Sequence, residues 1–267
     1  MTPTADLAVI GGSGFYSFVS GGAEVEIDTP YGPPSDPVVV GEVAGRQVAF
    51  LARHGRGHRF PPHRIPYRAN LWALRSLGVR EIFAPCAVGS LRPEVGPGSL
   101  VVPDQLVDRT AARVQTFYDE GAVHVPFADP YCPRGRATVV AESVSAGWPA
   151  RDGGTMVVIE GPRFSTRAES RSYAAAGWSL VNMTGHPEAV LARELALCYT
   201  AVALVTDLDA GVETGTAVTQ EEVFRVFATN TSRLRDLLVR VVGALSPRTG
   251  CPCPHALDGI ETGLALP

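Results

Sequence analysis

The sequence contains no lysine, and all 23 of its basic residues are arginine. This absence excludes mechanisms that depend on a lysine amine: Schiff-base chemistry, attachment of pyridoxal phosphate and the Walker A phosphate-binding loop. Any phosphate that the chain binds must be held by arginine, backbone amides and hydroxyl groups.

An excess of positive charge and a long apolar run are lacking as well. The net charge is −4 at pH 7, so no overall basic field attracts nucleic acid or an anionic membrane. The longest apolar run, near residues 195–205, is too short to span a bilayer. The first residues, 1–6, do not resemble a signal peptide. We therefore expect a cytoplasmic protein with no nucleic-acid or membrane partner.

Cysteine is scarce and scattered, at positions Cys86, Cys132, Cys198, Cys251 and Cys253. An odd, dispersed set does not form a disulfide framework. Cys251 and Cys253 are tightly spaced, but a structural zinc site normally needs four ligands, and the sequence offers no matching second pair. We expect free thiols and no metal, with a local disulfide near the C-terminus as the alternative.

The 267 residues are 45% hydrophobic and 19% charged, which is typical of one globular α/β domain. Short apolar runs that alternate with helical patterns predict a central mixed, mainly parallel sheet flanked by helices. The predicted strands are residues 7–10, 47–52, 81–84, 100–102, 155–159, 180–182 and 200–206. The predicted helices are residues 67–77, 136–146, 166–176, 187–197 and 219–245, the last opened by the capping box Thr219-Gln220-Glu221-Glu222. We treat residues 1–267 as a single domain whose tail, after about residue 247, is weakly patterned.

Two segments could bind an anion. Gly11-Gly12-Ser13-Gly14 directly follows the first strand, and its glycines let backbone amides approach an anion closely, although a simple tight turn is equally consistent. The second segment, residues 53–59, combines Arg53 and His54 with further arginines. Its glycines argue against a helical metal site, whereas arginine donates in a fork that matches phosphate oxygens. A solvated basic loop and a nucleic-acid patch are the alternatives.

Two further segments could face a flat, polar ligand. Phe164 comes just after the carboxyl end of a buried strand, where α/β sheets place ligands, although a core phenylalanine beside a helix is the simpler reading. Asp207 and Asp209 emerge from the most apolar strand and would point the same way if that strand continued. Buried carboxyls have raised pKa values, so either could donate a proton. Helix capping or calcium binding are the alternatives.

In combination, these motifs resemble the trimeric purine nucleoside phosphorylase and 5′-deoxy-5′-methylthioadenosine phosphorylase family. The resemblance runs from about Val9 to Leu245 and rests on five motifs in the same order. These are Gly11-Gly12-Ser13-Gly14, Leu51-Ala52-Arg53-His54-Gly55, Glu160-Gly161-Pro162-Arg163-Phe164-Ser165, Asn182-Met183-Thr184 and Thr206-Asp207-Leu208-Asp209. The family's reaction is phosphorolysis, in which inorganic phosphate attacks C1′ of a purine nucleoside and the free base departs, with no metal or organic cofactor.

The resemblance implies a role for each matched residue. The implied catalytic residues are Asp207, Arg53 and His54. The implied phosphate site contains Ser13, Arg53, His54, Cys86, Ala87 and Thr184. The implied nucleoside site contains Phe164, Ser165, Met183, Asp207, Leu208, Asp209, Gln220, Val223 and Phe224, with His124 supplied by a neighbouring subunit of a homotrimer.

Specificity follows from the same residues. An aspartate accepts hydrogen bonds from a 6-amino group, whereas a 6-oxopurine favours asparagine at the position of Asp207. An apolar 5′ pocket suits a methylthio group, so we favour methylthioadenosine and a role in purine salvage. Cys86, Gln220 and the Gly185-His186 pair depart from the family pattern, which weakens one phosphate contact and leaves the 5′ substituent open. The alternatives are 6-oxopurine nucleosides, methylthioinosine, a 5′-halo-5′-deoxyadenosine, a hydrolytic nucleosidase and a non-catalytic nucleotide-binding module.

Overall fold

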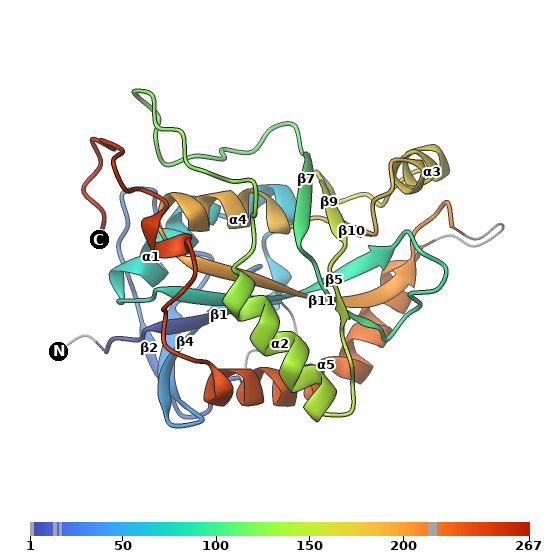
Figure 1. Cartoon of the computed structure of the whole chain (residues 1–267), viewed down its shortest axis with the longest axis horizontal. Helices are drawn as coiled ribbons and strands as arrows, with labels where there is room; N and C mark the ends of the chain where they lie inside the picture. The colour runs from blue at the N-terminus through green and yellow to red at the C-terminus, as the bar shows by residue number, and fades with distance from the viewer. Residues whose placement is uncertain (1–2, 13–14, 16–17, 213–217) are drawn as a thin grey trace.

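Apolar runs rich in Val, Ile, Leu and Ala form the strands of one twisted sheet (Figure 1). The computed structural model describes residues 3–12, 15, 18–212 and 218–267. Within these residues the strands are β1 (Leu7–Gly11), β2 (Ala23–Val25), β3 (Val38–Val43), β4 (Arg46–Ala52), β5 (Glu81–Ser90), β6 (Leu100–Val102), β7 (Gln105–Arg109), β8 (Arg151–Asp152), β9 (Thr155–Ile159), β10 (Leu180–Asn182) and β11 (Cys198–Leu208).

The helices occupy the positions that their periodicity and caps predict. They are α1 (Tyr67–Ser76), α2 (Pro133–Ser145), α3 (Arg167–Ala175), α4 (Gly185–Glu194) and α5 (Gln220–Ala244), with short 3-10 turns η1 (Arg56–His58), η2 (Pro62–Arg64) and η3 (Cys253–His255). The Thr219 side chain accepts a hydrogen bond from the Glu222 backbone N–H, as the predicted cap requires. The sequence analysis missed a second cap, the reciprocal box of Thr166 and Glu169 that opens α3.

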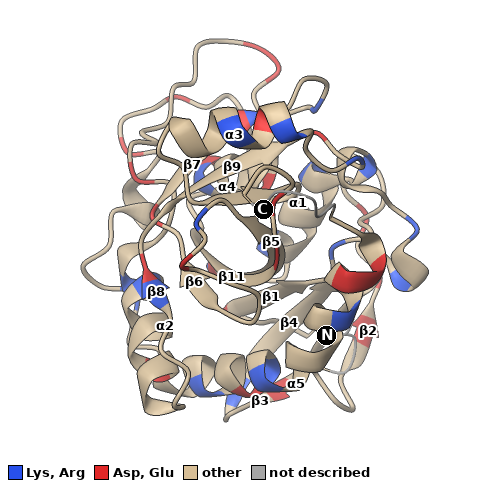
Figure 2. Cartoon of the chain, turned by 90° about the vertical axis from the view of Figure 1, so that its right-hand side faces the viewer, with Lys and Arg blue, Asp and Glu red and all other residues tan. Residues whose placement is uncertain are grey.

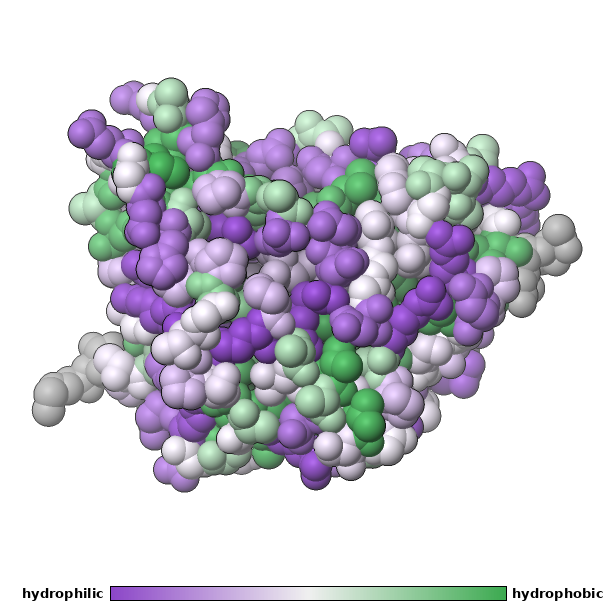
Figure 3. All heavy atoms as spheres, viewed as in Figure 1, coloured by the Kyte–Doolittle hydropathy of each residue, from purple (hydrophilic) through white to green (hydrophobic). Residues whose placement is uncertain are grey.

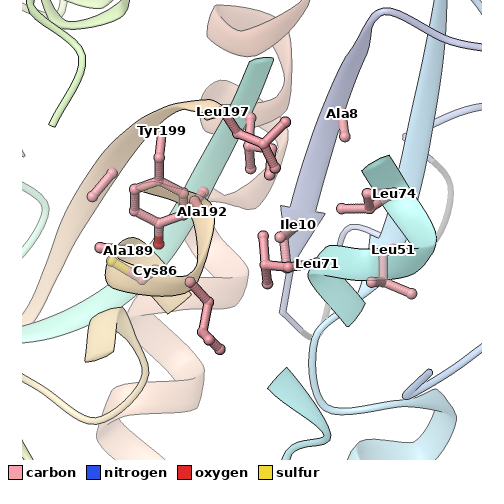
Figure 4. Packing of buried hydrophobic residues seen from close by; sticks show 14 of the residues in the cluster. Ala8, Ile10, Leu51, Leu71, Leu74, Cys86, Ala189, Ala192, Leu197 and Tyr199 are labelled. Carbon is pink, nitrogen blue, oxygen red and sulfur yellow. The ribbon is translucent and has the colours of Figure 1, made fainter. Parts of the chain in front are cut away.

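The alternation of side chains along β1 divides the core into two layers. Leu7 and Val9 pack in the layer that contains Val139 of α2 and Leu234 of α5. Ala8 and Ile10 pack in the opposite layer, against α1 and α4 (Figure 4). Because successive strand residues point to opposite faces, one fully buried strand supplies both layers. Figure 1 accordingly shows α1 and α4 on one side of the sheet and α2 and α5 on the other.

The central strands run in one direction, which brings their carboxyl ends together. The order β4-β1-β5-β11 is parallel at each step. Four further pairs are antiparallel: β2 with β3, β3 with β4, β10 with β5, and β6 with β11. The predicted mixed, mainly parallel sheet in a single α/β domain is confirmed. Ligands of such sheets bind at the carboxyl edge.

Several strand boundaries differ from the predictions. β5 and β11 extend to Ser90 and Leu208, beyond the predicted ends, because each continues along the other through a register shift between Val205 and Asp207. The sequence analysis missed β2, β3, β7 and β8. β2 and β8 are two or three residues long and mostly exposed, so they carry no hydrophobic pattern.

The surface carries both signs of charge. On the face shown in Figure 2, arginine and acidic residues are interspersed over the outer helices. On the face shown in Figure 3, hydrophilic and hydrophobic residues alternate in small groups. Across the described residues, none of the helices combines the length and apolar character that a bilayer crossing requires.

Candidate active site

A cavity of about 390 Å³ opens at the carboxyl ends of the parallel strands. It is the size of a small-ligand site. Most residues assigned by the resemblance line it: Arg53, His54, Cys86, Ala87, Phe164, Ser165, Met183, Thr184, Asp207, Asp209, Gln220, Val223 and Phe224. Segments that are far apart in the sequence therefore meet in one place, as the motif set requires.

Arg53 directly follows β4 and is only 2% exposed. Its Nε and Nη2 atoms donate to the two carboxylate oxygens of Glu188 at 2.7 and 2.9 Å. Nη2 and Nη1 also donate to the carbonyls of Ile10 and Pro85, at 2.9 and 3.0 Å. Ile10 belongs to β1 and Pro85 to β5, and both lie beyond the last residues that pair these two strands, Val9 and Phe83. The guanidinium therefore satisfies two carbonyl acceptors at the point where β1 and β5 separate. One Nη1 hydrogen is left for a ligand.

His54 lies beside Arg53 as a neutral imidazole. Burial lowers its pKa to about 3, and the neighbouring His58 and Arg53 add to the shift. Nδ1 lies 2.9 Å from the carbonyl of Phe60, which can only accept, so Nδ1 carries the proton and Nε2 is an acceptor. The ring stacks on His58 with centroids 4.0 Å apart. His54 can therefore accept a hydrogen bond from a protonated phosphate oxygen.

A side-chain amide fixes the turn between β10 and α4. The Oδ1 atom of Asn182 accepts from the backbone N–H groups of Thr184 and Gly185, at 2.8 and 2.7 Å, and its Nδ2 donates to the Ala87 carbonyl. This arrangement holds Thr184 just past the end of β10, on the wall of the cavity, where its side chain can reach a ligand. Cys86 also lines the cavity. Burial raises the pKa of the Cys86 thiol to about 12, so this thiol is protonated at neutral pH.

Asp207 and Asp209 both face Gly89 across the β5–β11 pair. A Cβ added at Gly89 would lie 3.0 Å from Oδ1 of Asp207 and 3.5 Å from Oδ1 of Asp209. The Asp209 N–H donates to the Ser90 carbonyl, so the pairing continues past the end of β11 and the predicted common orientation is confirmed. A side chain at position 89 would crowd the two carboxylates and occupy space in the cavity.

Burial changes the acidity of both aspartates. Desolvation raises the pKa of Asp207 to about 6, and the neighbouring Asp209 adds to the rise. The Thr206 hydroxyl opposes it by donating to Oδ2 of Asp207 at 2.8 Å. Desolvation also raises the pKa of Asp209, whose Oδ2 is buried without a hydrogen-bond partner among the described residues. A group with a pKa near 6 can deliver a proton close to neutral pH.

The remaining walls are mostly apolar. Phe164 and Met183 line the cavity near Gly161, which has a φ of +64° and whose Cβ would overlap the Met183 sulfur. A side chain at this position would displace Met183, which explains the glycine of the Glu160-Gly161-Pro162 motif. Val223 and Phe224, from the first turns of α5, form the opposite wall, and Phe224 is 46% exposed.

Two predicted residues do not line the cavity, and the position of a third is not described. Ser13 lies outside the described residues. Leu208 points away, because it lies between the two inward-facing aspartates. His124 is exposed in the segment between β7 and α2. The sequence analysis in turn missed Glu188, which no local pattern connects to Arg53, 135 residues earlier.

The structure also corrects the cysteine analysis. Cys251 and Cys253 do have a matching second pair, because Cys132 at the start of α2 and Cys198 at the start of β11 lie beside them. All five cysteines are unbridged in this structure. The second pair was invisible in the sequence because its members are 66 residues apart and meet only through the packing of α2 on β11.

Comparison with known proteins agrees with this geometry. The model of the Phosphorylase superfamily matches residues 6–243. The chain belongs to this superfamily. It is accordingly an enzyme of the nucleoside phosphorylase family, a group of pentosyltransferases, as its motifs predict.

Relatives in this superfamily cover almost the whole chain. The purine nucleoside phosphorylase of Streptomyces coelicolor is 61% identical, over 98% of each chain. The S-methyl-5′-thioadenosine phosphorylase of Mycolicibacterium smegmatis is 58% identical, over 98% of this chain and 99% of the relative. The crystal structure of a methylthioadenosine phosphorylase from an Antarctic soil metagenomic library superposes with a TM-score of 0.90 at 42% identity, over 96% of this chain and 91% of that chain. A Schistosoma mansoni mutant enzyme solved with methylthioadenosine superposes with a TM-score of 0.84 at 35% identity.

Proposed function

We propose that this phosphorylase cleaves 5′-deoxy-5′-methylthioadenosine with inorganic phosphate to give adenine and 5-methylthioribose 1-phosphate. The observation that carries the proposal is the buried aspartate pair facing Gly89 inside a cavity whose other end holds Arg53, His54 and Thr184. One end of this cavity suits a purine edge and the other suits an anion. The names of the mycobacterial relative and of the solved structures support the same substrate.

The two ends of the cavity would act on opposite sides of one bond. A phosphate oxygen forms a bond to C1′ while the C1′–N9 bond breaks and its electron pair passes to the base. The transition state resembles a sugar cation, so an anion beside the ring and a neutralised leaving base both lower its energy. Asp207, with a pKa of about 6, would donate the proton to N7. Arg53, Thr184 and neutral His54 would hold the phosphate.

The hydrogen-bonding pattern of Asp207 favours adenine. The outer edge of adenine offers N7 as an acceptor and the 6-amino group as a donor, whereas a 6-oxopurine offers two acceptors. A protonated carboxyl group has one donor and one acceptor, which match adenine, while the amide nitrogen of an asparagine would supply the two donors that a 6-oxopurine needs. Ser165 and Asp209 would complete the base site, with Phe164 against the purine face and Met183 beside the ribose.

The wall formed by α5 suits an apolar 5′ group. Val223 and Phe224 line the cavity together with buried Phe227, and Gln220 is the polar residue among them. A methylthio group gains burial against such a wall at about 25 cal/mol per Å² of apolar surface, whereas a hydroxyl there loses hydrogen bonds to water.

We further infer that the whole chain acts as one catalytic domain in a cytoplasmic homotrimer of purine salvage, without a catalytic cofactor or metal. The resemblance assigns His124 to the site of a neighbouring subunit, and its exposure outside the cavity of its own chain leaves it accessible to such a neighbour. Sedimentation equilibrium at several concentrations tests the assembly. Mixing His124→Ala chains with Asp207→Ala chains should restore activity if the sites are shared between subunits.

Base release with and without phosphate tests the reaction. We expect phosphate-dependent release of adenine, faster from methylthioadenosine than from adenosine. Release that is independent of phosphate would indicate a nucleosidase. Faster release from inosine or methylthioinosine would favour the second candidate, a phosphorylase of 6-oxopurine nucleosides. The Streptomyces relative is named a purine nucleoside phosphorylase without a methylthio substrate.

A further inference from the structure

Four cysteine sulfurs converge far from the substrate cavity. The Sγ atoms of Cys132, Cys198, Cys251 and Cys253 all lie within 4.8 Å of one another. None of the four side chains is more than 5% exposed. The fifth cysteine, Cys86, lies in the cavity and is not part of this cluster.

Close packing of two elements brings the first two sulfurs together. Cys132 is the N-cap of α2, and its backbone N–H donates to the Tyr199 carbonyl at 2.8 Å. Cys198 is the first residue of β11. Gly135 allows this approach, because a Cβ there would overlap the Thr200 hydroxyl. The pair is thus built into the rigid part of the fold.

The C-terminal segment supplies the other two sulfurs. After α5 the chain has no regular structure except η3, yet it turns back over the molecule (Figure 1). Cys251 Sγ comes to 3.5 Å from Cys198 Sγ. The Arg134 guanidinium, which donates to the Ser246 carbonyl, lies beside the Cys198 and Cys251 sulfurs. The same guanidinium pairs with the buried carboxylate of Glu81, so the N-terminus of α2 and an arginine with a counter-charge face the sulfur cluster.

We propose that these four cysteines form a tetrathiolate site that holds one Zn²⁺ and fastens the C-terminal segment to α2 and β11. With Zn–S bonds of about 2.3 Å, tetrahedral coordination separates the sulfurs by about 3.8 Å, close to the spacing seen here. Two disulfides would need two pairs at about 2.0 Å, whereas all four sulfurs here approach a common centre. Arg134, which it would share with Glu81, would offset only part of the negative charge that four thiolates and one divalent cation leave. The site takes no part in the proposed phosphorolysis.

Metal and thiol content of the whole chain, purified without chelator, test the proposal. Elemental analysis should give one zinc per chain, and denaturation with a chelator should release five thiols. No zinc with one reactive thiol would indicate two disulfides, and no zinc with five thiols would indicate apolar packing of thiols. The proposal is overturned if the chain still binds no zinc after anaerobic reduction and incubation with ZnCl₂. Iron in place of zinc would also overturn it.

Variants locate the metal. Cys253→Ser should weaken zinc binding by about 100-fold or more, since changes even outside the ligand shell cost roughly 10–100-fold. The matched control Cys86→Ser should keep one zinc per chain. Co²⁺ bound to the reduced chain should show the visible absorption of tetrahedral thiolate coordination, and Cys253→Ser should lose it. Equal zinc in both variants would exclude the cluster as the site.

Discussion

The guanidinium of Arg53 and the carboxylate of Glu188 form a two-pronged ion pair inside the protein, with N–O distances of 2.7 and 2.9 Å. Both side chains are at most 3% exposed. Tyr199 completes the arrangement by donating to Glu188 at 2.7 Å. Glu188 therefore fixes the orientation of the arginine that faces the phosphate end of the cavity.

Removing Glu188 should strongly destabilise the fold. Glu188→Ala leaves a buried arginine without its counter-charge, which costs about 3–5 kcal/mol. Urea unfolding monitored by circular dichroism measures the change. The control Glu24→Gln breaks an exposed ion pair with Arg56 and should leave the free energy of unfolding nearly unchanged. Similar losses in the two variants would contradict the importance of the buried pair.

Asp207→Asn should change which purine is cleaved. The amide gains a second donor and loses the proton that neutralises N7, so the kcat/KM ratio of adenine to 6-oxopurine nucleosides should fall about 100-fold or more. Initial rates with adenosine and inosine measure this ratio. The exposed control Asp152→Asn should leave it unchanged. A constant ratio in Asp207→Asn would refute the recognition of the base by this residue.

The same substitution should stabilise the protein at neutral pH. The pKa of Asp207 rises from 3.8 to about 6 on folding, so folding favours the protonated acid. This contribution is complete below about pH 4 and is lost as the pH rises through 6. Above pH 6 the ionised group costs about 3 kcal/mol, which the amide avoids. The free energies of unfolding of the two proteins should therefore diverge progressively as the pH rises from about 4 to about 6, and they should differ most at pH 8.

His54 should remain neutral across the working range of the enzyme. Its pKa is lowered from 6.5 to about 3 by burial, so the stability that depends on the neutral ring is complete above pH 6.5 and is lost as the pH falls toward 3. Heteronuclear NMR of the imidazole nitrogens should show the Nδ1–H tautomer at pH 6. A doubly protonated ring at that pH would contradict the proposed acceptor role of Nε2.

The glycine between α2 and β11 should resist substitution. Gly135→Ala forces a methyl group against Thr200, and overpacking of this kind costs about 1–3 kcal/mol. Gly96→Ala is the matched control, because a Cβ there meets nothing within 4 Å. Thermal unfolding of the two variants should separate them clearly.

Local patterns in the sequence were sufficient to predict the helices and the inner strands. The Thr219 capping box and the helical pattern of residues 219–245 predicted α5 almost to the residue. Motif order also predicted most of the cavity. β2 and β8 could not be predicted, because they are held only by backbone pairing with a neighbouring strand and carry no burial pattern of their own.

Relations that depend on packing were not visible in the sequence. Glu188 looked like any polar residue of a first helical turn, and only the fold places it on Arg53. Cys132 and Cys198 likewise acquire a common environment only when α2 lies on β11. In both cases a buried polar or sulfur-containing side chain found its partner across more than 50 residues of chain.

Helix α5, about 37 Å long, joins two tasks in one element. Its first turn presents Val223 and exposed Phe224 to the cavity, while Leu234, Leu238 and Val241 are fully buried in the core. Substitutions near the start of α5 can thus alter the accepted 5′ group without creating a cavity in the hydrophobic core. The enzyme's substrate range can evolve on one end of the helix while the other end preserves the folded state.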